Sequence, residues 1–167
     1  DNELRVEPRY YREHWVGREA SIRGIMDLVG LDDPVMRTCH GHQVFSSEVL
    51  FTAGSADLAP EGRAQIAGVV RILDEVRAEI PEEIDWIIRV DGHTDATPIS
   101  PGARYADNWE LSQARALSVV RFMQDDLGFP PARLAATGFG EYRPVAEGES
   151  PAALAANRRI ELKLTER

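Results

Sequence analysis

Residues 86–95 have the sequence Trp-Ile-Ile-Arg-Val-Asp-Gly-His-Thr-Asp, a short apolar run that passes into a polar turn. The nearly continuous apolar run from Trp86 to Val90 predicts a buried, central β-strand. Gly92 and the polar residues that follow it predict that the strand ends there. A polar loop then extends to residue 107, and loops of this length are more often functional than incidental.

Amphipathic helices are predicted before and after this strand in the sequence. The first begins near Pro60 and ends at Pro81, with an apolar stripe formed by Ile66, Val69, Val70, Leu73, Val76 and Ile80. The second runs from about Asn108, which we expect to be its N-cap, to Asp126, and Gly128 ends it.

Further strands are predicted at 44–51, at 134–137 and, after a short helix at 151–156, at 159–164. The order β-α-β-α-β, then a short helix and a final strand, indicates an α/β (α+β) fold with one sheet covered by helices. Residues 1–43 read as a separate N-terminal helical extension or linker, with helical spacing from about Tyr10 to Val29. Residues 44–167 form the predicted domain.

The overall composition excludes several classes of protein. The net charge of -9 argues against non-specific nucleic-acid binding, which requires a basic surface. No apolar run reaches the roughly 18–20 residues needed to cross a bilayer, and no signal peptide is visible. Because the chain starts at Asp1, we expect a processed protein or part of a longer one.

Metal binding and catalysis are weakly indicated. Asp91, His93 and Asp95 could point the same way as metal ligands if the strand continued, but Gly92 argues that it does not. The segment 39–42, Cys-His-Gly-His, has residue types that suit zinc in a spacing that matches no common site. Ser112 and His93 could be part of a triad on paper, yet no nucleophile-elbow sequence is present.

Two arginine-containing segments are further candidates for binding. Asn108 and Arg115 lie seven residues apart, so they share one helix face with Leu111 between them. Periodicity alone favours a solvated arginine at this position. In the final strand, alternation places Arg159 and Glu161 on one face, and a planar guanidinium there could hold a carboxylate.

Five segments in order resemble the OmpA-like C-terminal domain family, in particular its MotB-like and Pal-like branch. They are residues 51–58 (Phe-Thr-Ala-Gly-Ser-Ala-Asp-Leu), 92–95 (Gly-His-Thr-Asp), 108–116 (Asn-Trp-Glu-Leu-Ser-Gln-Ala-Arg-Ala), 137–141 (Thr-Gly-Phe-Gly-Glu) with Pro144 and Val145, and 157–161 (Asn-Arg-Arg-Ile-Glu). The resemblance covers roughly residues 44–165. It implies a mixed sheet with helices on one side and non-covalent binding of peptidoglycan, with no catalysis, cofactor or metal.

The resemblance also implies roles for individual residues. Asp95 corresponds to the aspartate that takes the ammonium of diaminopimelate in the stem peptide, and Arg115 to the arginine that takes a ligand carboxylate. Asn108 and Leu111 correspond to groove-lining residues, and Thr94 and Arg159 are weaker correspondences. The segment 96–107 is longer than in compact members, which leaves its conformation open.

From this resemblance we expect a periplasmic module that anchors an envelope protein to the sacculus, with a membrane anchor or membrane-protein partner outside this segment. It also allows a homodimer. Two alternatives remain: a peptidoglycan hydrolase or metal-dependent amidase that uses His93 and Asp95, and a scaffold that recognises a protein partner.

Overall fold

The computed structural model describes residues 42–80 and 82–166. The expected N-terminal helical extension lies outside the described residues and stays a prediction. Residues 39–41, whose spacing matched no common zinc site, also lie outside them. The expected start of the domain at residue 44 falls inside the first strand, β1, which spans His42–Ser46.

Four strands form a mixed sheet in the order β1-β4-β2-β3. The central strand β2 (Trp86–His93) pairs in parallel with β3 (Leu134–Gly138) and antiparallel with β4 (Arg159–Glu166). Strand β1 pairs antiparallel with β4. The prediction that the run 86–90 is a buried central strand is therefore confirmed, as is the α+β fold.

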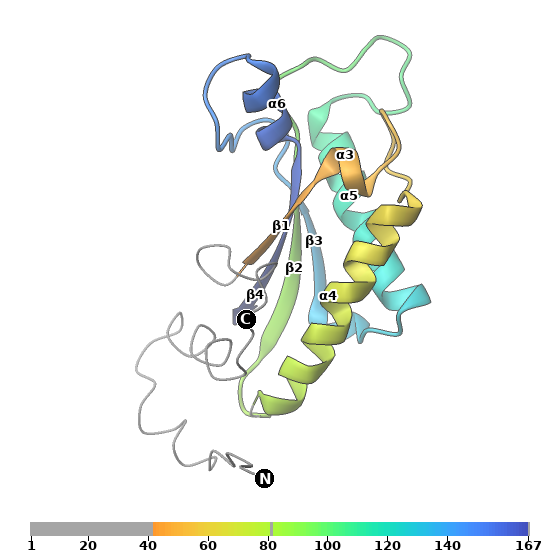
Figure 1. The fold of residues 1–167 in the computed structure, drawn as a ribbon, viewed down its shortest axis with the longest axis vertical. Coiled ribbons are helices and arrows are strands. Elements are labelled where there is room, and N and C mark those ends of the chain that lie inside the picture. The colour runs from red at the N-terminus through yellow and green to blue at the C-terminus, as the bar shows by residue number, and fades with distance from the viewer. Residues whose placement is uncertain (1–41, 81, 167) are drawn as a thin grey trace.

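Two long helices, α4 (Pro60–Glu79) and α5 (Asn108–Arg121), cover one face of this sheet (Figure 1). Helix α5 continues through a π-helical turn, η1 (Phe122–Asp126), and a 3-10 turn, η2 (Pro131–Arg133), leads into β3. The main core lies between the sheet and the helices. Its fully buried members include Ile66, Ile88, Val90, Val119, Phe129 and Ile160.

The strand predicted at 44–51 is wrong in its second half. After β1 the chain forms one helical turn, α3 (Ser47–Leu50), because the Ser46 side chain caps it by accepting a hydrogen bond from the Glu48 N–H (3.3 Å). This turn buries Leu50 completely in the core. The short helix predicted at 151–156 is present as α6 (Pro151–Asn157), capped by Ser150.

The start of α5 also differs from the prediction. Asp107, not Asn108, is the N-cap, and its carboxylate accepts a hydrogen bond from the Glu110 N–H (2.8 Å). Asn108 becomes the first helical residue, so its amide is free to bond to the loop that follows β2. This shift of one residue matters for the site described below.

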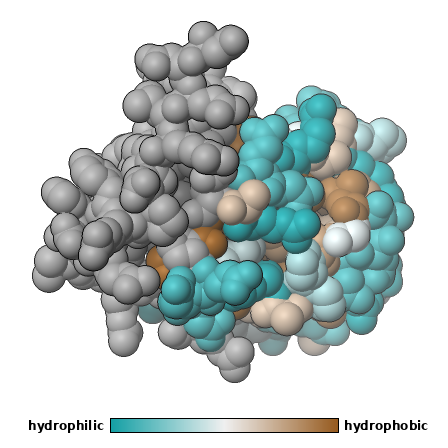
Figure 2. Space-filling view, turned by 90° about the horizontal axis from the view of Figure 1, so that it is seen from below, coloured by the Kyte–Doolittle hydropathy of each residue, from teal (hydrophilic) through white to brown (hydrophobic). Residues whose placement is uncertain are grey.

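The elements that carry the candidate site gather at one end of the described structure. The carboxyl ends of β2 and β3, the start of α5 and helices α3 and α6 all gather at one end (Figure 1). Figure 2 views the molecule from the opposite end, where the described residues form a mostly hydrophilic surface with small, separate hydrophobic areas. Within residues 42–80 and 82–166, no helix has the length and apolar character required to cross a membrane.

Candidate ligand-binding site

Asp95 lies just beyond the end of β2, buried and already ion-paired. Its Oδ2 is 2.5 Å from Nη1 of Arg158, and its Oδ1 accepts a hydrogen bond from the Thr97 N–H (2.9 Å). Burial alone would raise the pKa of this carboxyl group, but the bonds from Arg158 and Thr97 outweigh burial and hold the pKa below its usual value. Asp95 is therefore a carboxylate at neutral pH.

Arg158 is shared between two carboxylates. Besides Asp95 it also bonds to the carboxylate of Glu48 in α3. The Arg158 side chain is 28% exposed and that of Glu48 is 59% exposed, whereas the Asp95 side chain is 9% exposed. The guanidinium thus bridges the buried end of the site to the solvent.

Asn108 ties the first turn of α5 to the segment that contains Asp95. Its Nδ2 lies 3.4 Å from the backbone oxygen of Asp95, 3.1 Å from that of Thr97 and 2.6 Å from Oε2 of Glu141. The longer 96–107 segment is thereby held against the helix. Its conformation, which the sequence left open, is further fixed by apolar packing of Ile99 and Tyr105 on Leu111 and Ala56.

Two paired glycines let α5 approach the sheet closely. Gly92 of β2 and Gly138 of β3 are partners in the ladder. A Cβ atom on Gly92 would lie 2.2 Å from the backbone oxygen of Ser112, and one on Gly138 would lie 2.6 Å from the backbone nitrogen of Gln113. The Gln113 amide accepts from the Gly138 N–H (2.7 Å) and lies 3.4 Å from the Ala136 oxygen, so side-chain bonds hold the helix where the glycines permit it.

Arg115 is a buried guanidinium with an incomplete set of partners. It is 7% exposed, its Nε donates to the backbone oxygen of Ser55 (2.9 Å), and its guanidinium lies 5.2 Å from the centre of the Phe51 ring. No carboxylate lies within ion-pair distance of it in the described part of the chain. Burial lowers the pKa of Arg115, and the charges of Asp95 and Arg158 also act on it. The prediction of a solvated arginine is therefore wrong.

Of the two weaker site predictions, Thr94 lies next to Asp95 and Arg159 does not. Thr94 is buried beside Asp95, its N–H donates to the Gly140 oxygen (2.9 Å), and its hydroxyl has no hydrogen-bond partner among residues 42–80 and 82–166. Arg159 instead points away from the helices and bonds to Glu161 (2.6 Å). The arginine that meets Asp95 is its neighbour Arg158, which the sequence pattern did not single out.

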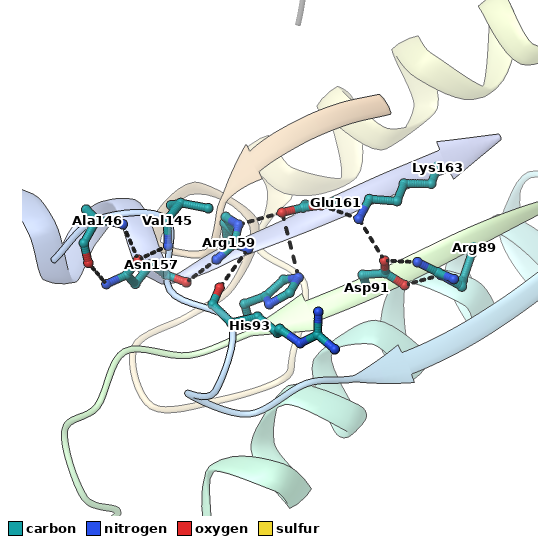
Figure 3. A network of polar contacts seen from close by, with 10 residues as sticks. Arg89, Asp91, His93, Val145, Ala146, Asn157, Arg159, Glu161 and Lys163 are labelled. Atoms are coloured by element: carbon teal, nitrogen blue, oxygen red, sulfur yellow. Dashed lines mark hydrogen bonds and ion pairs between the residues drawn. The ribbon is translucent and has the colours of Figure 1, made fainter. Parts of the chain in front are cut away.

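The outer face of the sheet, which does not carry α4 and α5, holds a chain of alternating charges (Figure 3). Arg89 bonds to Asp91 (2.7 Å), Lys163 lies 3.3 Å from Asp91 and 2.7 Å from Glu161, and Glu161 bonds to Arg159. Burial would raise the pKa of Glu161, but the bonds from Lys163 and Arg159 outweigh it and lower the pKa to about 2.

His93 lies in this network without a hydrogen bond. Both of its ring nitrogens lack a partner within the described segments, its Nε2 is 3.7 Å from Oε1 of Glu161, and its ring stacks on Phe139. Burial and the positive charge of Arg159 lower the pKa of His93 to about 4, against the partial opposition of Glu161 and Asp91. The imidazole is therefore neutral at pH 7.

This arrangement predicts a specific pH dependence of stability. Between pH 6.5 and about 4 the unfolded chain binds a proton at His93 and the folded chain does not, so the free energy of unfolding falls as the pH falls. We expect His93→Gln to flatten the profile in this window, by about 1–3 kcal/mol in total. Urea unfolding at a series of pH values measures the effect.

The control for this prediction lies at lower pH. Between about pH 4.5 and 2 protonation of Glu161 should destabilise both proteins alike, because the folded state lowers the pKa of that carboxyl group as well. Parallel profiles for wild type and His93→Gln above pH 4.5 would refute the assignment to His93.

The metal and enzyme alternatives find no support in this geometry. Among the described residues, no three His, Cys, Asp or Glu side chains lie close enough together to hold a metal ion. Asp91 and His93 belong to the outer face, whereas Asp95 is held by Arg158 beyond the end of the strand. The side chains required for the hydrolase hypothesis are therefore not assembled around Asp95.

Comparison with known proteins agrees with the fold and the motifs. The family model described as the OmpA family matches residues 50–158. This chain belongs to the OmpA family. It is a family of non-enzymatic domains, in keeping with the expectation that the chain is not an enzyme.

Three relatives illustrate the match. The peptidoglycan-associated lipoprotein of Pseudomonas aeruginosa is 35% identical over 113 residues, which cover 68% of this chain and 59% of that protein. The crystal structure of a putative MotB-like protein from Desulfovibrio vulgaris is 33% identical with a TM-score of 0.67, covering 87% of this chain and 90% of that one. The cell wall anchor of the T6SS from Pseudomonas aeruginosa is 28% identical with a TM-score of 0.62, covering 90% of this chain and 100% of that one.

The match to curated relatives is partial in length. The chain spans 26–59% of the length of four of the curated relatives that it matches, including 59% of the lipoprotein named above. What the relatives do as whole proteins is therefore not transferred by the match itself.

Proposed function

We propose that this chain is a non-catalytic domain that binds peptidoglycan through the diaminopimelate residue of the stem peptide and anchors an envelope protein to the sacculus. The observation that carries the proposal is Arg115, a buried guanidinium without a carboxylate partner in the described part of the chain. A buried charge is costly unless it is paired, so its persistence here suits a site that receives an anionic group from a ligand.

The second charged group has the opposite sign and lies close enough to Arg115 to influence its pKa. Asp95 stays ionised at neutral pH and offers a carboxylate to an ammonium group. Diaminopimelate carries an ammonium and carboxylates on one residue, so one ligand can satisfy both groups by charge-assisted bonds. Lysine in the same position lacks the additional carboxylate and would leave Arg115 unpaired, which gives selectivity.

Two further groups fit this proposal. Thr94 precedes Asp95 in the chain, and its buried hydroxyl has no hydrogen-bond partner among the described residues. Asn108 and Leu111 hold the loop and the apolar wall next to the charged pair. Arg159 has no place in this version of the site, because its side chain is engaged with Glu161 on the outer face.

The ligand ammonium and Arg158 would both bond to the Asp95 carboxylate, and their like charges would repel each other. Glu48 already bonds to Arg158, so the guanidinium can move toward that exposed carboxylate without losing all of its partners. In the ligand-free protein Arg158 therefore keeps the buried Asp95 neutralised, and Glu48 lowers the cost of releasing it.

The names of the relatives support the location that we propose. One is called a peptidoglycan-associated lipoprotein and another a cell wall anchor. By analogy, this domain would lie in the periplasm and tether a membrane-bound partner to the wall. The proposal includes a membrane anchor or a membrane-protein partner outside this segment, and it allows a homodimer.

A pull-down with purified sacculi tests the proposed function. Wild type should sediment with the sacculi, free diaminopimelate should release it, and the Asp95→Ala, Arg115→Ala double variant should remain in the supernatant.

The matched control removes one arginine and one aspartate elsewhere. Arg63 and Asp126 lie 3.8 Å apart with half-exposed side chains, so Arg63→Ala, Asp126→Ala makes the same change of charge outside the site. Retention of this control together with loss of the Asp95, Arg115 variant supports the site. Equal retention of both double variants would contradict it, and retention that diaminopimelate cannot compete would favour a scaffold for another partner.

A further inference from the structure

Two exposed aromatic rings, one in the first turn of α5 and one in the loop after β3, stack on each other. Trp109 and Tyr142 are 50% and 58% exposed, and their ring centres lie 4.9 Å apart at an interplanar angle of 28°. Large aromatic side chains contribute the most when they bury apolar area, so two of them stacked on the surface are unusual unless something covers them. The proposed function uses neither ring.

The backbone beneath the rings is built to hold them in place. Gly140 has a positive φ of 60°, and a Cβ atom there would lie 3.3 Å from Cδ2 of Tyr142 and 3.4 Å from Cδ2 of Trp109. The Gly140 N–H donates to the Ser112 hydroxyl (2.9 Å), which in turn donates to the Trp109 backbone oxygen (3.0 Å). These bonds hold the Gly140 backbone against the first turn of α5, where the two rings stack.

The same loop connects the rings to the charged site. The Gly140 oxygen accepts a hydrogen bond from the Thr94 N–H, one residue before Asp95. Asn108, the residue before Trp109, bonds both to the Asp95 segment and to Glu141, the residue before Tyr142. The residues that hold the Asp95 segment are thus the immediate chain neighbours of the aromatic pair.

We infer that Trp109 and Tyr142 form a subsite for the glycan strand of peptidoglycan, on which the apolar face of a pyranose ring of an N-acetylated sugar stacks. This inference rests on the proposed function and adds a second contact to it. The negative π-faces of aromatic rings attract the polarised C–H groups of a sugar.

The covalent structure of the ligand favours this occupant over an unrelated partner. Two residues separate diaminopimelate from the muramic acid to which the stem peptide is attached, a span on the order of 10 Å. A ligand held at Asp95 and Arg115 must therefore place its sugar near the edge of the same site. The net charge of -9 argues against stacked nucleobases, whose phosphates the protein would repel.

The test compares two ligands that differ only in the sugar. Isothermal titration calorimetry would measure a diaminopimelate-containing tetrapeptide and the same tetrapeptide attached to its disaccharide. We expect wild type to bind the disaccharide form roughly threefold to tenfold more tightly, the scale of an aromatic stacking contact. The Trp109→Ala, Tyr142→Ala double variant should bind the two ligands equally.

A matched control and a second readout make the outcome decisive. Val145 is 62% exposed but not part of the stacked pair, so Val145→Ala should keep the difference between the two ligands. The indole N–H resonance of Trp109 should shift when the disaccharide form binds and stay in place with the tetrapeptide alone. A difference that survives in the double variant, or that is absent in wild type, overturns the glycan subsite alone. Failure of wild type to bind the tetrapeptide overturns the proposed function and this inference with it.

Discussion

Replacing Gly92 with alanine is expected to lower the free energy of unfolding by at least about 3 kcal/mol. The added Cβ atom would lie 2.2 Å from the backbone oxygen of Ser112 and 3.0 Å from its carbonyl carbon. Both atoms belong to the backbone of α5, so no side-chain rotation can relieve the clash. The helix or the central strand has to move, and the core between them has to repack.

The same change should also weaken ligand binding beyond its effect on stability. Gly92 sets how closely α5 approaches β2, and the site is made of groups from both elements: Asp95 follows β2, whereas Asn108 and Arg115 belong to α5. A shift of the helix separates the two charges that are proposed to hold one ligand. Urea unfolding and the sacculus pull-down, measured on the fraction that is folded, separate the two effects.

A second glycine provides the control. Gly68 lies inside α4, and the nearest atom to a Cβ there is the flexible Nη2 of Arg71 at 3.9 Å. Gly68→Ala should raise the free energy of unfolding by about 0.5–1 kcal/mol, since alanine is the better helix former. Equal destabilisation by the two substitutions would show that the close approach at Gly92 is not the cause.

The elements with a strong periodic pattern could be predicted from the sequence, and those fixed by tertiary contacts could not. The run 86–90 and the apolar stripe from Ile66 to Leu73 repeat with the spacing of a buried strand and an amphipathic helix, and both elements are present. At 47–50 the sequence is apolar enough for a strand. A serine cap and the burial of Leu50 instead favour a helical turn, which short-range periodicity does not report.

Within the candidate site, the sequence predicted which polar and charged residues are present better than it predicted which side chains they contact. Asp95 and Asn108 lie together, because the loop after β2 and the first turn of α5 are adjacent, and Leu111 packs on Tyr105 of the same loop. The contact between Asp95 and Arg158 joins residues 63 positions apart and could not be read from spacing. In the adjacent pair Arg158 and Arg159, only the point at which β4 begins decides which side chain faces Asp95, and strand boundaries are the least predictable feature of a sequence.

The largest functional effect is expected from Arg115→Met. Methionine preserves much of the length and apolar volume of the side chain but removes the charge. Loss of a buried, charge-assisted contact to a ligand carboxylate should reduce affinity for the diaminopimelate-containing tetrapeptide by at least about 30-fold. Stability should stay within about 1 kcal/mol of wild type. The variant loses the bond to the Ser55 oxygen. It also removes the cost of burying a charge that has no carboxylate partner in the described part of the chain, and the two effects offset each other.

Arg159→Met should behave in the opposite way, although Arg159 is equally buried. Its guanidinium pairs with Glu161 at 2.6 Å, so its removal leaves a buried carboxylate with less compensation and should cost about 3 kcal/mol or more. Because the side chain lies on the outer face, affinity for the tetrapeptide should change little in the folded protein. Calorimetric titration and urea unfolding of both variants measure the two quantities separately.

The contrast between these two arginines separates a residue retained for binding from one retained for stability. A protein that keeps a buried, unpaired guanidinium gives up stability unless a ligand supplies the missing anion, whereas a paired guanidinium supports the fold whether or not a ligand is present. If Arg115→Met proves strongly destabilising and still binds the tetrapeptide, Arg115 is structural and the ligand carboxylate is held elsewhere. If Arg159→Met abolishes binding at unchanged stability, the outer face, not the end of β2, is the surface that meets the wall.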